Sequence, residues 1–223
     1  VRVCTILSQL LSALEQAHTD GIIHCDLKPA NIMLEEVAGQ SDFVKVLDFG
    51  IAKIKGPAME VGPYTQAGNI VGTFDYMSPE QIEGRKVDSR SDIYSLGITA
   101  YHLLTGEPPF NGETPLAVAV QHLHKEPPKL AEVAPQVPEP LTAVVAQMMA
   151  KAPESRFQSP QELLRALREV AKLAAQEGWA EGPENWSLAD LESPAEIEAT
   201  QQLDALHHAL RSLTIPRRTS RLL

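Results

Sequence analysis

Residues 92–104 constrain the fold most, because their apolar side chains would point to nearly every side of a helix. A helix of this kind is expected at the centre of a domain. Gly106 and the pair Pro108-Pro109 end it, since glycine tolerates the left-handed position after a helix and proline cannot continue one. With 223 residues, 43% of them hydrophobic, the chain is long enough for one good core. We therefore expect a globular protein with one core and, at most, an appendage.

Amphipathic helices are expected before and after this central helix. The first carries an apolar stripe at helical spacing and stops at Gly21; its stripe is Val3, Ile6, Leu7, Leu10, Leu11, Leu14 and Ala17. Later helices are predicted at residues 116–123, 141–149 and 159–170, the last opening on Ser-Pro-Gln-Glu, the pattern of a capping box with proline at the first helical position. Two short apolar stretches, 32–34 and 43–47, have the turn-forming sequence Ala-Gly-Gln-Ser-Asp between them and predict a hairpin. The expected fold class is mainly α with a small β-hairpin.

The composition changes beyond about residue 172. Residues 177–204 carry eight acidic side chains and no Lys or Arg, whereas residues 205–223 carry four Arg and no acid. We expect residues 1–170 to form the domain, and residues 171–223 to form an acidic linker and a weakly helical tail with a basic end.

Charge and cysteine content exclude several classes of protein. The net charge is −10, which argues against a nucleic-acid binder or a membrane-surface protein that relies on a basic face. No run of about 18 apolar residues occurs, so no membrane span is predicted. Cys4 and Cys25 have no metal-site spacing and indicate no disulfide framework. A reducing, cytoplasmic setting is the simplest expectation.

Three short motifs point to chemistry. His-Cys-Asp-Leu-Lys-Pro-Ala-Asn at residues 24–31 is followed 17 residues later by Asp-Phe-Gly at 48–50, and 28 residues after that by Ser-Pro-Glu at 78–80. Transfer of a phosphoryl group requires an aligned hydroxyl and neutralised phosphate charge. Asp26 offers a carboxylate to a hydroxyl, Lys28 a cation to a phosphate and Asn31 an amide oxygen to a metal, while Asp48 is a hard ligand suited to Mg²⁺.

Together, in this order and with a hairpin between the first two, the motifs resemble the catalytic loop, the metal-binding segment and the Ala-Pro-Glu segment of eukaryotic-type protein kinases. The resemblance covers roughly residues 1–170. Lys28 in Asp-Leu-Lys-Pro and Thr73 in Gly-Thr-Phe-Asp-Tyr resemble the Ser/Thr-specific branch of the family. The sequence VGTFDYMSPEQ at residues 71–81 is similar to that of bacterial members. The resemblance implies the C-terminal lobe of a kinase fold, and transfer of the γ-phosphate of ATP, with Mg²⁺, to Ser/Thr hydroxyls of protein substrates.

The resemblance also implies roles for single residues. Asp26 would be the catalytic base, Lys28 the contact to the γ-phosphate, and Asn31 and Asp48 the magnesium ligands. Met33 falls where the family places an apolar floor under the adenine ring, although a bare methionine is by default a core residue.

Three further residues match structural positions of the family. Glu80 and Arg156 match a buried ion pair, and losing either partner would cost about 3–5 kcal/mol. Asp92 matches the residue that braces the catalytic loop through its backbone amides, and we place it at the opening of the buried helix.

One departure from the family concerns phosphorylation. Cys25 stands where many members carry an arginine that gathers a phosphate from the activation segment, and a cysteine cannot serve that electrostatic role. The implied enzyme would not need that switch, and Cys25 is expected to be a plain buried thiol. Thr65 is a plausible phosphorylation site, with an ordinary loop threonine as the alternative.

A second departure concerns the binding of ATP, the phosphate donor. The sequence contains no G-x-G-x-x-G, and Ile51-Ala52-Lys53, the nearest thing to V-A-I-K, follows the Asp-Phe-Gly motif. In the family these elements belong to an N-terminal lobe that precedes the first helix here. We therefore expect a fragment that transfers phosphate inefficiently alone, with that lobe upstream or supplied in trans. The alternative is a non-catalytic binding module that docks substrates or a partner kinase, which a true start at Val1 would favour.

Overall fold

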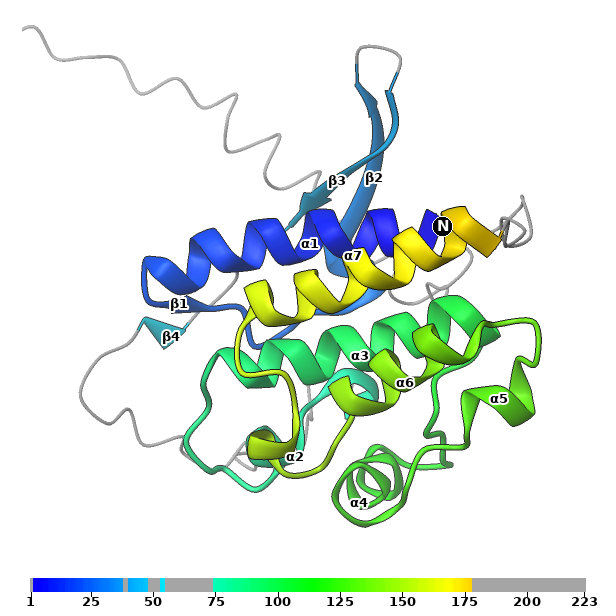
Figure 1. Cartoon of the computed structure of the whole chain (residues 1–223). Helices are drawn as coiled ribbons and strands as arrows, with labels where there is room; N and C mark the ends of the chain where they lie inside the picture. Colours follow the sequence, from blue (N-terminus) through cyan, green and yellow to red (C-terminus); the bar gives the residue numbers. More distant parts are fainter. Residues whose placement is uncertain (1, 38–39, 48–52, 55–73, 178–223) are drawn as a thin grey trace, which may run out of the picture. The chain divides into compact units, whose positions relative to one another are not determined.

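In the computed structural model of the protein, the described residues are 2–37, 40–47, 53–54 and 74–177 (Figure 1). All of these residues belong to the first of the two units into which the chain divides, residues 1–191. Most of these residues are helical, and the strands form two small antiparallel pairs. The expected fold class, mainly α with a small hairpin, is confirmed at this level.

The central helix is α3 (Ser89–Thr105), whose residues 91–102 are all buried. The Asp88 carboxylate caps its start by accepting a hydrogen bond from the Arg90 amide at 2.9 Å, which satisfies one of the free N–H groups of the first turn. Asp92 therefore lies inside the helix, and our prediction that it opens the helix was wrong. At the other end Gly106 has φ 85° and its amide donates to the His102 carbonyl, as predicted for a glycine stop.

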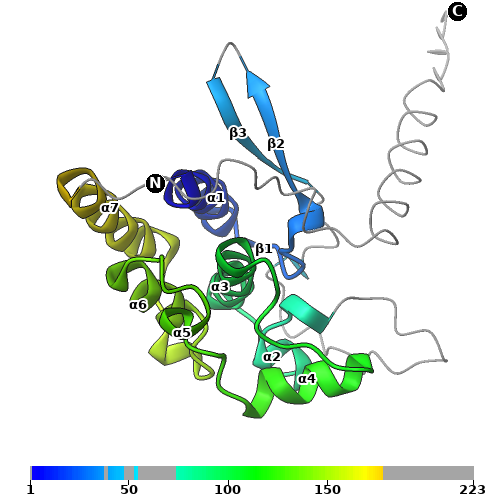
Figure 2. The ribbon, with the colours of Figure 1, turned by 90° about the vertical axis from the view of Figure 1, so that its right-hand side faces the viewer.

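Two long helices lie side by side, and the first of them contacts α3. The apolar stripe of α1 (Arg2–Thr19) is buried apart from Val3, which is partly buried. α1 packs against α3, against β3 and along α7 (Pro160–Glu177) (Figures 1 and 2). The start of α7 forms only half of the expected capping box: Ser159 Oγ accepts from the Glu162 amide, but the Glu162 carboxylate accepts from the Gln158 amide instead of that of Ser159. Because α7 ends at Glu177, it crosses position 170, where we expected the domain to end.

The hairpin consists of β2 (Ile32–Val37) and β3 (Gln40–Val46). Ile32 pairs with Val46 and Leu34 with Val44, so these four side chains share the face that packs against the core. The strands are longer than the apolar stretches: residues 40–42, which we assigned to the connection, belong to β3. A second pair, β1 (Ile22–Ile23) with β4 (Lys53–Ile54), was not predicted, because two-residue strands have too few positions to show an alternation.

Polar side chains of α1 fix the hairpin. Arg2 donates two hydrogen bonds to the Asp42 carboxylate, both 2.8 Å. The Gln9 side chain donates to the Asp42 carbonyl at 2.7 Å and accepts from the Val44 amide at 3.1 Å. The Gln9 carboxamide thus takes the place of a neighbouring strand along β3 and fixes this strand against α1.

The remaining elements are short. Two agree with prediction, α4 (Pro115–His124) and α6 (Glu139–Met148). The others were not singled out from the sequence: η1 (Pro29–Asn31), η2 (Phe74–Tyr76), α2 (Pro79–Ile82), α5 (Leu130–Val133) and η3 (Pro153–Ser155). Across the described ranges, none of the helices has the length and apolar content needed to cross a membrane.

Candidate functional site

The segment 24–31 begins where β1 ends, and Asp92 of α3 holds its first two residues. The His24 amide donates to Asp92 Oδ2 at 2.9 Å, and the Cys25 amide donates to Asp92 Oδ1 at 2.8 Å. Asp92 is fully buried, and a buried carboxylate is costly unless hydrogen bonds compensate it. The central helix therefore fixes the backbone of this segment directly.

His18 of α1 completes the surroundings of Asp92. Its Nε2 lies 2.7 Å from Asp92 Oδ2, whereas its Nδ1 is buried and has no hydrogen-bond partner within the described ranges. No Lys or Arg among the described residues forms an ion pair with Asp92, so the carboxylate relies on two amides and one imidazole. Sequence reasoning missed His18, because a single histidine near a helix end carries no distinguishing pattern.

Cys25 has a strained backbone. Its φ is 63°, in the left-handed region, which costs a residue with a Cβ roughly 1–2 kcal/mol. Its carbonyl accepts a hydrogen bond of 2.7 Å from Gln81 Nε2 of α2. The residue is only partly buried, so our expectation of a plain buried thiol was wrong.

Asp26, Lys28 and Asn31 lie together. Asn31 Nδ2 donates to the Asp26 carbonyl at 2.7 Å and to Asp26 Oδ2 at 3.1 Å, while Lys28 Nζ lies 3.5 Å from the same Oδ2. The Asp26 side chain is 61% exposed and that of Lys28 only 18%. Both contacts use Oδ2, so within the described part of the chain Asp26 Oδ1 is not engaged. The arrangement offers one carboxylate oxygen to an incoming group and keeps a cation beside it.

The same segment holds the end of β3. The Leu47 amide donates to the Asn31 carbonyl at 2.8 Å, and His24 Nε2 lies 3.2 Å from the Leu47 carbonyl. Because the Asp26 amide donates to His24 Nδ1 at 3.3 Å, the proton of this imidazole belongs on Nε2. Asp48 follows Leu47 in the sequence; Asp48, Thr65 and Thr73 lie outside the described residues.

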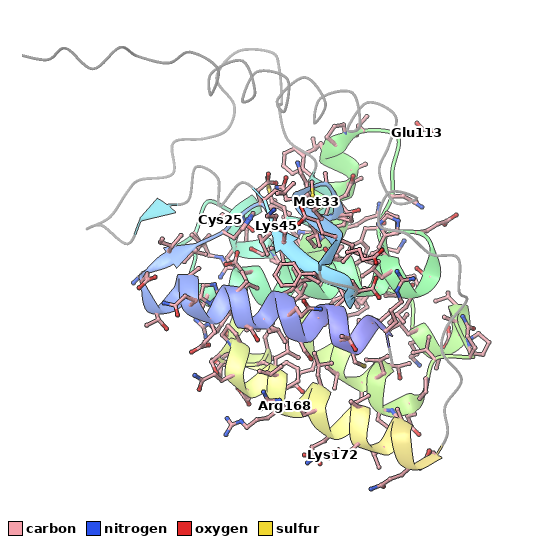
Figure 3. All side chains as sticks on the ribbon, turned by 90° about the horizontal axis from the view of Figure 1, so that it is seen from above. Cys25, Met33, Lys45, Glu113, Arg168 and Lys172 are labelled. Atoms are coloured by element: carbon pink, nitrogen blue, oxygen red, sulfur yellow. The ribbon has the colours of Figure 1, made fainter. Side chains whose placement is uncertain are left out.

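Met33 lies on β2, directly opposite Lys45 of β3, on the face of the hairpin turned away from the core. It is partly buried. Figure 3 shows Met33 and Lys45 on the same side of α1 as Cys25, while Arg168 and Lys172 of α7 lie on the opposite side. One side of the molecule therefore carries the hairpin face and the segment 24–31 together.

Glu80 and Arg156 form a buried ion pair. The Arg156 guanidinium donates to Glu80 Oε1 at 2.7 Å and to Oε2 at 2.9 Å, and Ser91 Oγ donates to Oε1 at 2.6 Å. Burial alone would raise the pKa of Glu80, but the hydrogen bonds and charge of Arg156, with the bond from Ser91, lower it below its usual value. Arg156 also donates to three backbone carbonyls, those of Ala150, Lys151 and Arg90. The pair thus ties α2 to α3 and to the loop before η3.

Asn31 offers a side-chain oxygen, Oδ1, that is suited to a divalent metal and has no hydrogen-bond partner among the described residues. The described ranges contain no group of three or more His, Cys, Asp or Glu side chains placed to hold a metal. Asn31 makes its side-chain hydrogen bonds through Nδ2, so its Oδ1 has no partner among the residues described. This oxygen fits one position in the shell of a hard cation such as Mg²⁺, which prefers few protein ligands and keeps several waters.

Comparison with known proteins identifies a family over most of the described residues. The family model described as "Protein kinase domain" matches residues 2–167. The chain is 49% identical over 166 residues to the serine/threonine-protein kinase Pkn1 of Myxococcus xanthus, covering 74% of this chain and 24% of that protein. It is 41% identical over 178 residues to the probable serine/threonine-protein kinase PknB of Corynebacterium glutamicum, covering 78% and 27%. For the serine/threonine-protein kinase PknB of Mycolicibacterium smegmatis the identity is 45% over 163 residues, covering 73% and 25%. The chain thus spans about a quarter of the length of these relatives.

Proposed function

The chain belongs to the protein kinase domain family, as its three motifs predicted, and from this premise we propose that segment 24–31 serves transfer of the γ-phosphate of ATP to Ser/Thr hydroxyls of protein substrates. The geometry around Asp26 supports the proposal most strongly. Its carboxylate is exposed, one oxygen is held by Asn31 and Lys28, and the other is unengaged within the described residues. A positioned but accessible carboxylate is what a general base for a hydroxyl requires.

Each residue of the segment has a distinct proposed task. Asp26 Oδ1 accepts the proton of the substrate hydroxyl, while Oδ2 stays fixed by Asn31 Nδ2. Lys28 Nζ, 3.5 Å from Oδ2, offsets negative charge both on Asp26 and on the phosphoryl group that moves past it. Asp92 holds the backbone before Asp26 and so fixes the direction from which the carboxylate approaches.

The same proposal assigns residues to the binding of Mg²⁺ and of the adenine ring. Asn31 Oδ1 and Asp48 would hold Mg²⁺, which supplies neutralisation of phosphate charge when bound. The contacts of Leu47 with Asn31 and His24 support this, because they bring the residue before Asp48 in the sequence to the Asn31 backbone. Met33, on the outer face of the hairpin, would lie under the adenine ring.

Several finer expectations join the proposal. The fold would be the C-terminal lobe of a kinase, and the phosphate-gripping lobe would come from residues outside the printed sequence or from another polypeptide. Thr65 and Thr73 would belong to the activation segment, which is a site of regulatory phosphorylation and contacts the protein substrate. Glu80, Asp92 and Arg156 would be structural, and the protein would work in the cytoplasm.

The test is transfer of labelled γ-phosphate from ATP, with Mg²⁺, to Ser, Thr and Tyr peptides by the chain joined to a compatible N-terminal kinase lobe. We expect label on Ser and Thr, and its loss in Asp26→Asn. Transfer that Asp26→Asn leaves unchanged would exclude the proposed role of Asp26. No transfer by a folded protein would overturn the catalytic proposal in favour of a docking module.

A further inference from the structure

We propose that Gln81 is a positioning residue whose side-chain NH₂ holds the peptide between Cys25 and Asp26 in place for the reaction. The inference rests on the proposed function, because it assigns a residue outside segment 24–31 to the orientation of Asp26. Gln81 belongs to α2, directly after the Ser-Pro-Glu motif, and is only partly buried.

The peptide between Cys25 and Asp26 is held at both of its polar groups. Gln81 Nε2 donates to its carbonyl, that of Cys25, at 2.7 Å. Its N–H, that of Asp26, donates to His24 Nδ1 at 3.3 Å, a longer bond. A peptide is planar, so fixing the carbonyl and the N–H fixes the position of the Asp26 Cα, the atom from which its side chain leaves.

The left-handed backbone of Cys25 makes this hold necessary. A residue with a Cβ leaves φ near 63° unless the surroundings determine it. Asp92 fixes the peptide before Cys25 through the Cys25 amide, but it does not contact the peptide after it. Rotation of that second peptide is opposed by the Gln81 donor and the weaker His24 contact, so Gln81 is the stronger of the two restraints.

The carboxamide of Gln81 has two separable tasks. Its Oε1 accepts from the Ser78 amide at 3.1 Å and from Ser78 Oγ at 2.9 Å, which stabilises the start of α2. Its Nε2 contacts the Cys25 carbonyl. Gln81→Glu is therefore a selective variant, since a carboxylate keeps the acceptor for Ser78 and loses the donor for Cys25.

The arrangement links two parts of the proposed machinery. α2 follows η2, and both lie in the stretch that carries the third motif, whereas Cys25 and Asp26 belong to the first. Through Gln81 a displacement of α2 changes the orientation of Asp26 directly, without passing through the central helix.

The experiment compares wild type, Gln81→Glu and Gln147→Glu, each joined to the same compatible N-terminal lobe. Gln147 is exposed on α6, so its variant adds the same charge away from the segment. We expect Gln81→Glu to lower kcat about tenfold, equivalent to about 1.4 kcal/mol, with KM for the peptide unchanged. Gln147→Glu should match wild type. Cys25→Gly, which accepts positive φ without strain, should reduce the loss caused by Gln81→Glu.

A second readout does not depend on activity. Hydrogen exchange of the Asp26 amide should be faster in Gln81→Glu than in wild type, while exchange of the Ile98 amide inside α3 stays the same. Unchanged kcat and unchanged Asp26 exchange in Gln81→Glu would overturn the inference. If Asp26 exchange accelerates but wild type transfers no phosphate, Gln81 holds the peptide and the proposed function has failed.

Discussion

Two buried carboxylates of α2 and α3, Glu80 and Asp92, are compensated in different ways. Glu80 faces the guanidinium of Arg156, with both carboxylate oxygens paired. Asp92 faces two consecutive backbone amides and His18. An ion pair between side chains joins elements of the fold, whereas a carboxylate that accepts from backbone amides dictates the conformation of the segment that donates them. We infer that Glu80 stabilises the fold and Asp92 shapes the site.

Loss of the guanidinium should have the largest effect on stability. Arg156→Leu leaves the Glu80 carboxylate buried without its cation and should cost about 3–5 kcal/mol of unfolding free energy, measured by urea denaturation. The double variant Glu80→Met/Arg156→Leu removes both charges and should recover a large part of that loss. A double variant no more stable than Arg156→Leu would show that the carbonyl contacts of Arg156 matter more than its pairing with Glu80.

Asp92→Asn tests the other half of the comparison. An asparagine in place of Asp92 offers only one oxygen to the two amides and sets an NH₂ group against the other. We expect a loss of about 1–3 kcal/mol in unfolding free energy. In the chain joined to an N-terminal kinase lobe, we also expect kcat of Asp92→Asn to fall under conditions in which the variant is still folded. If Asp92→Asn and the double variant Glu80→Met/Arg156→Leu reduced kcat equally, the distinction between fold and site would be wrong.

Gln9 can be compared with Asp92, because its side chain also forms hydrogen bonds with backbone groups but carries no charge. Gln9→Ala leaves the Val44 amide and the Asp42 carbonyl to water, and should cost about 0.5–1.5 kcal/mol. Exchange of the Val44 amide should accelerate more than that of Leu10 in α1. Equal acceleration of both amides would mean that α1 itself had loosened.

The smallest expected effect concerns Lys151, a cation that forms no ion pair within the described residues. Its Nζ is buried, has no hydrogen-bond partner in the described part of the chain and lies 4.4 Å from the centre of the Phe110 ring. Burial lowers the pKa of Lys151 to about 8 from 10.5; the charge of Glu126 opposes this shift and that of Arg156 adds to it. Because the unfolded chain binds this proton more tightly, stability should rise with pH between about 8 and 10.5.

Lys151→Met should remove that pH dependence. Below pH 8 it should also stabilise the protein slightly, by less than about 1 kcal/mol, because it removes a buried charge but also the contact of that charge with the Phe110 ring. Urea denaturation of both proteins at pH 7 and pH 10 measures the difference. A wild-type protein that loses stability relative to Lys151→Met as the pH rises would contradict the direction of this pKa shift.

The sequence was sufficient for features that repeat or follow a known pattern. The stripe of α1 and the all-round apolar surface of α3 predicted two helices whose buried residues agree with the structure. The motifs predicted the family, and the hairpin was expected between the first two. These features depend on periodicity or on several residues in fixed order.

Contacts made by single side chains across the chain could not be predicted. Gln9 and Gln81 contact backbone groups far away in sequence, and His18 contacts the carboxylate of Asp92. Nothing in their local sequence indicates a partner. The left-handed backbone of Cys25 was also missed, because glycine is the usual signal for positive φ. The pattern Ser-Pro-Glu-Gln at residues 78–81 did contain a signal, a capping box with proline at the first helical position, which would have placed α2.

The central claim is that the Asp26 carboxylate, held by the segment around it, accepts the proton of the substrate hydroxyl. The most direct test measures kcat for Asp26→Asn in the protein joined to the N-terminal lobe. The matched control is Asp20→Asn, at an exposed residue directly after α1. We predict that Asp26→Asn lowers kcat by about 10²–10⁴-fold with no loss of stability, and that Asp20→Asn retains wild-type activity. A kcat for Asp26→Asn close to that of Asp20→Asn would contradict the claim.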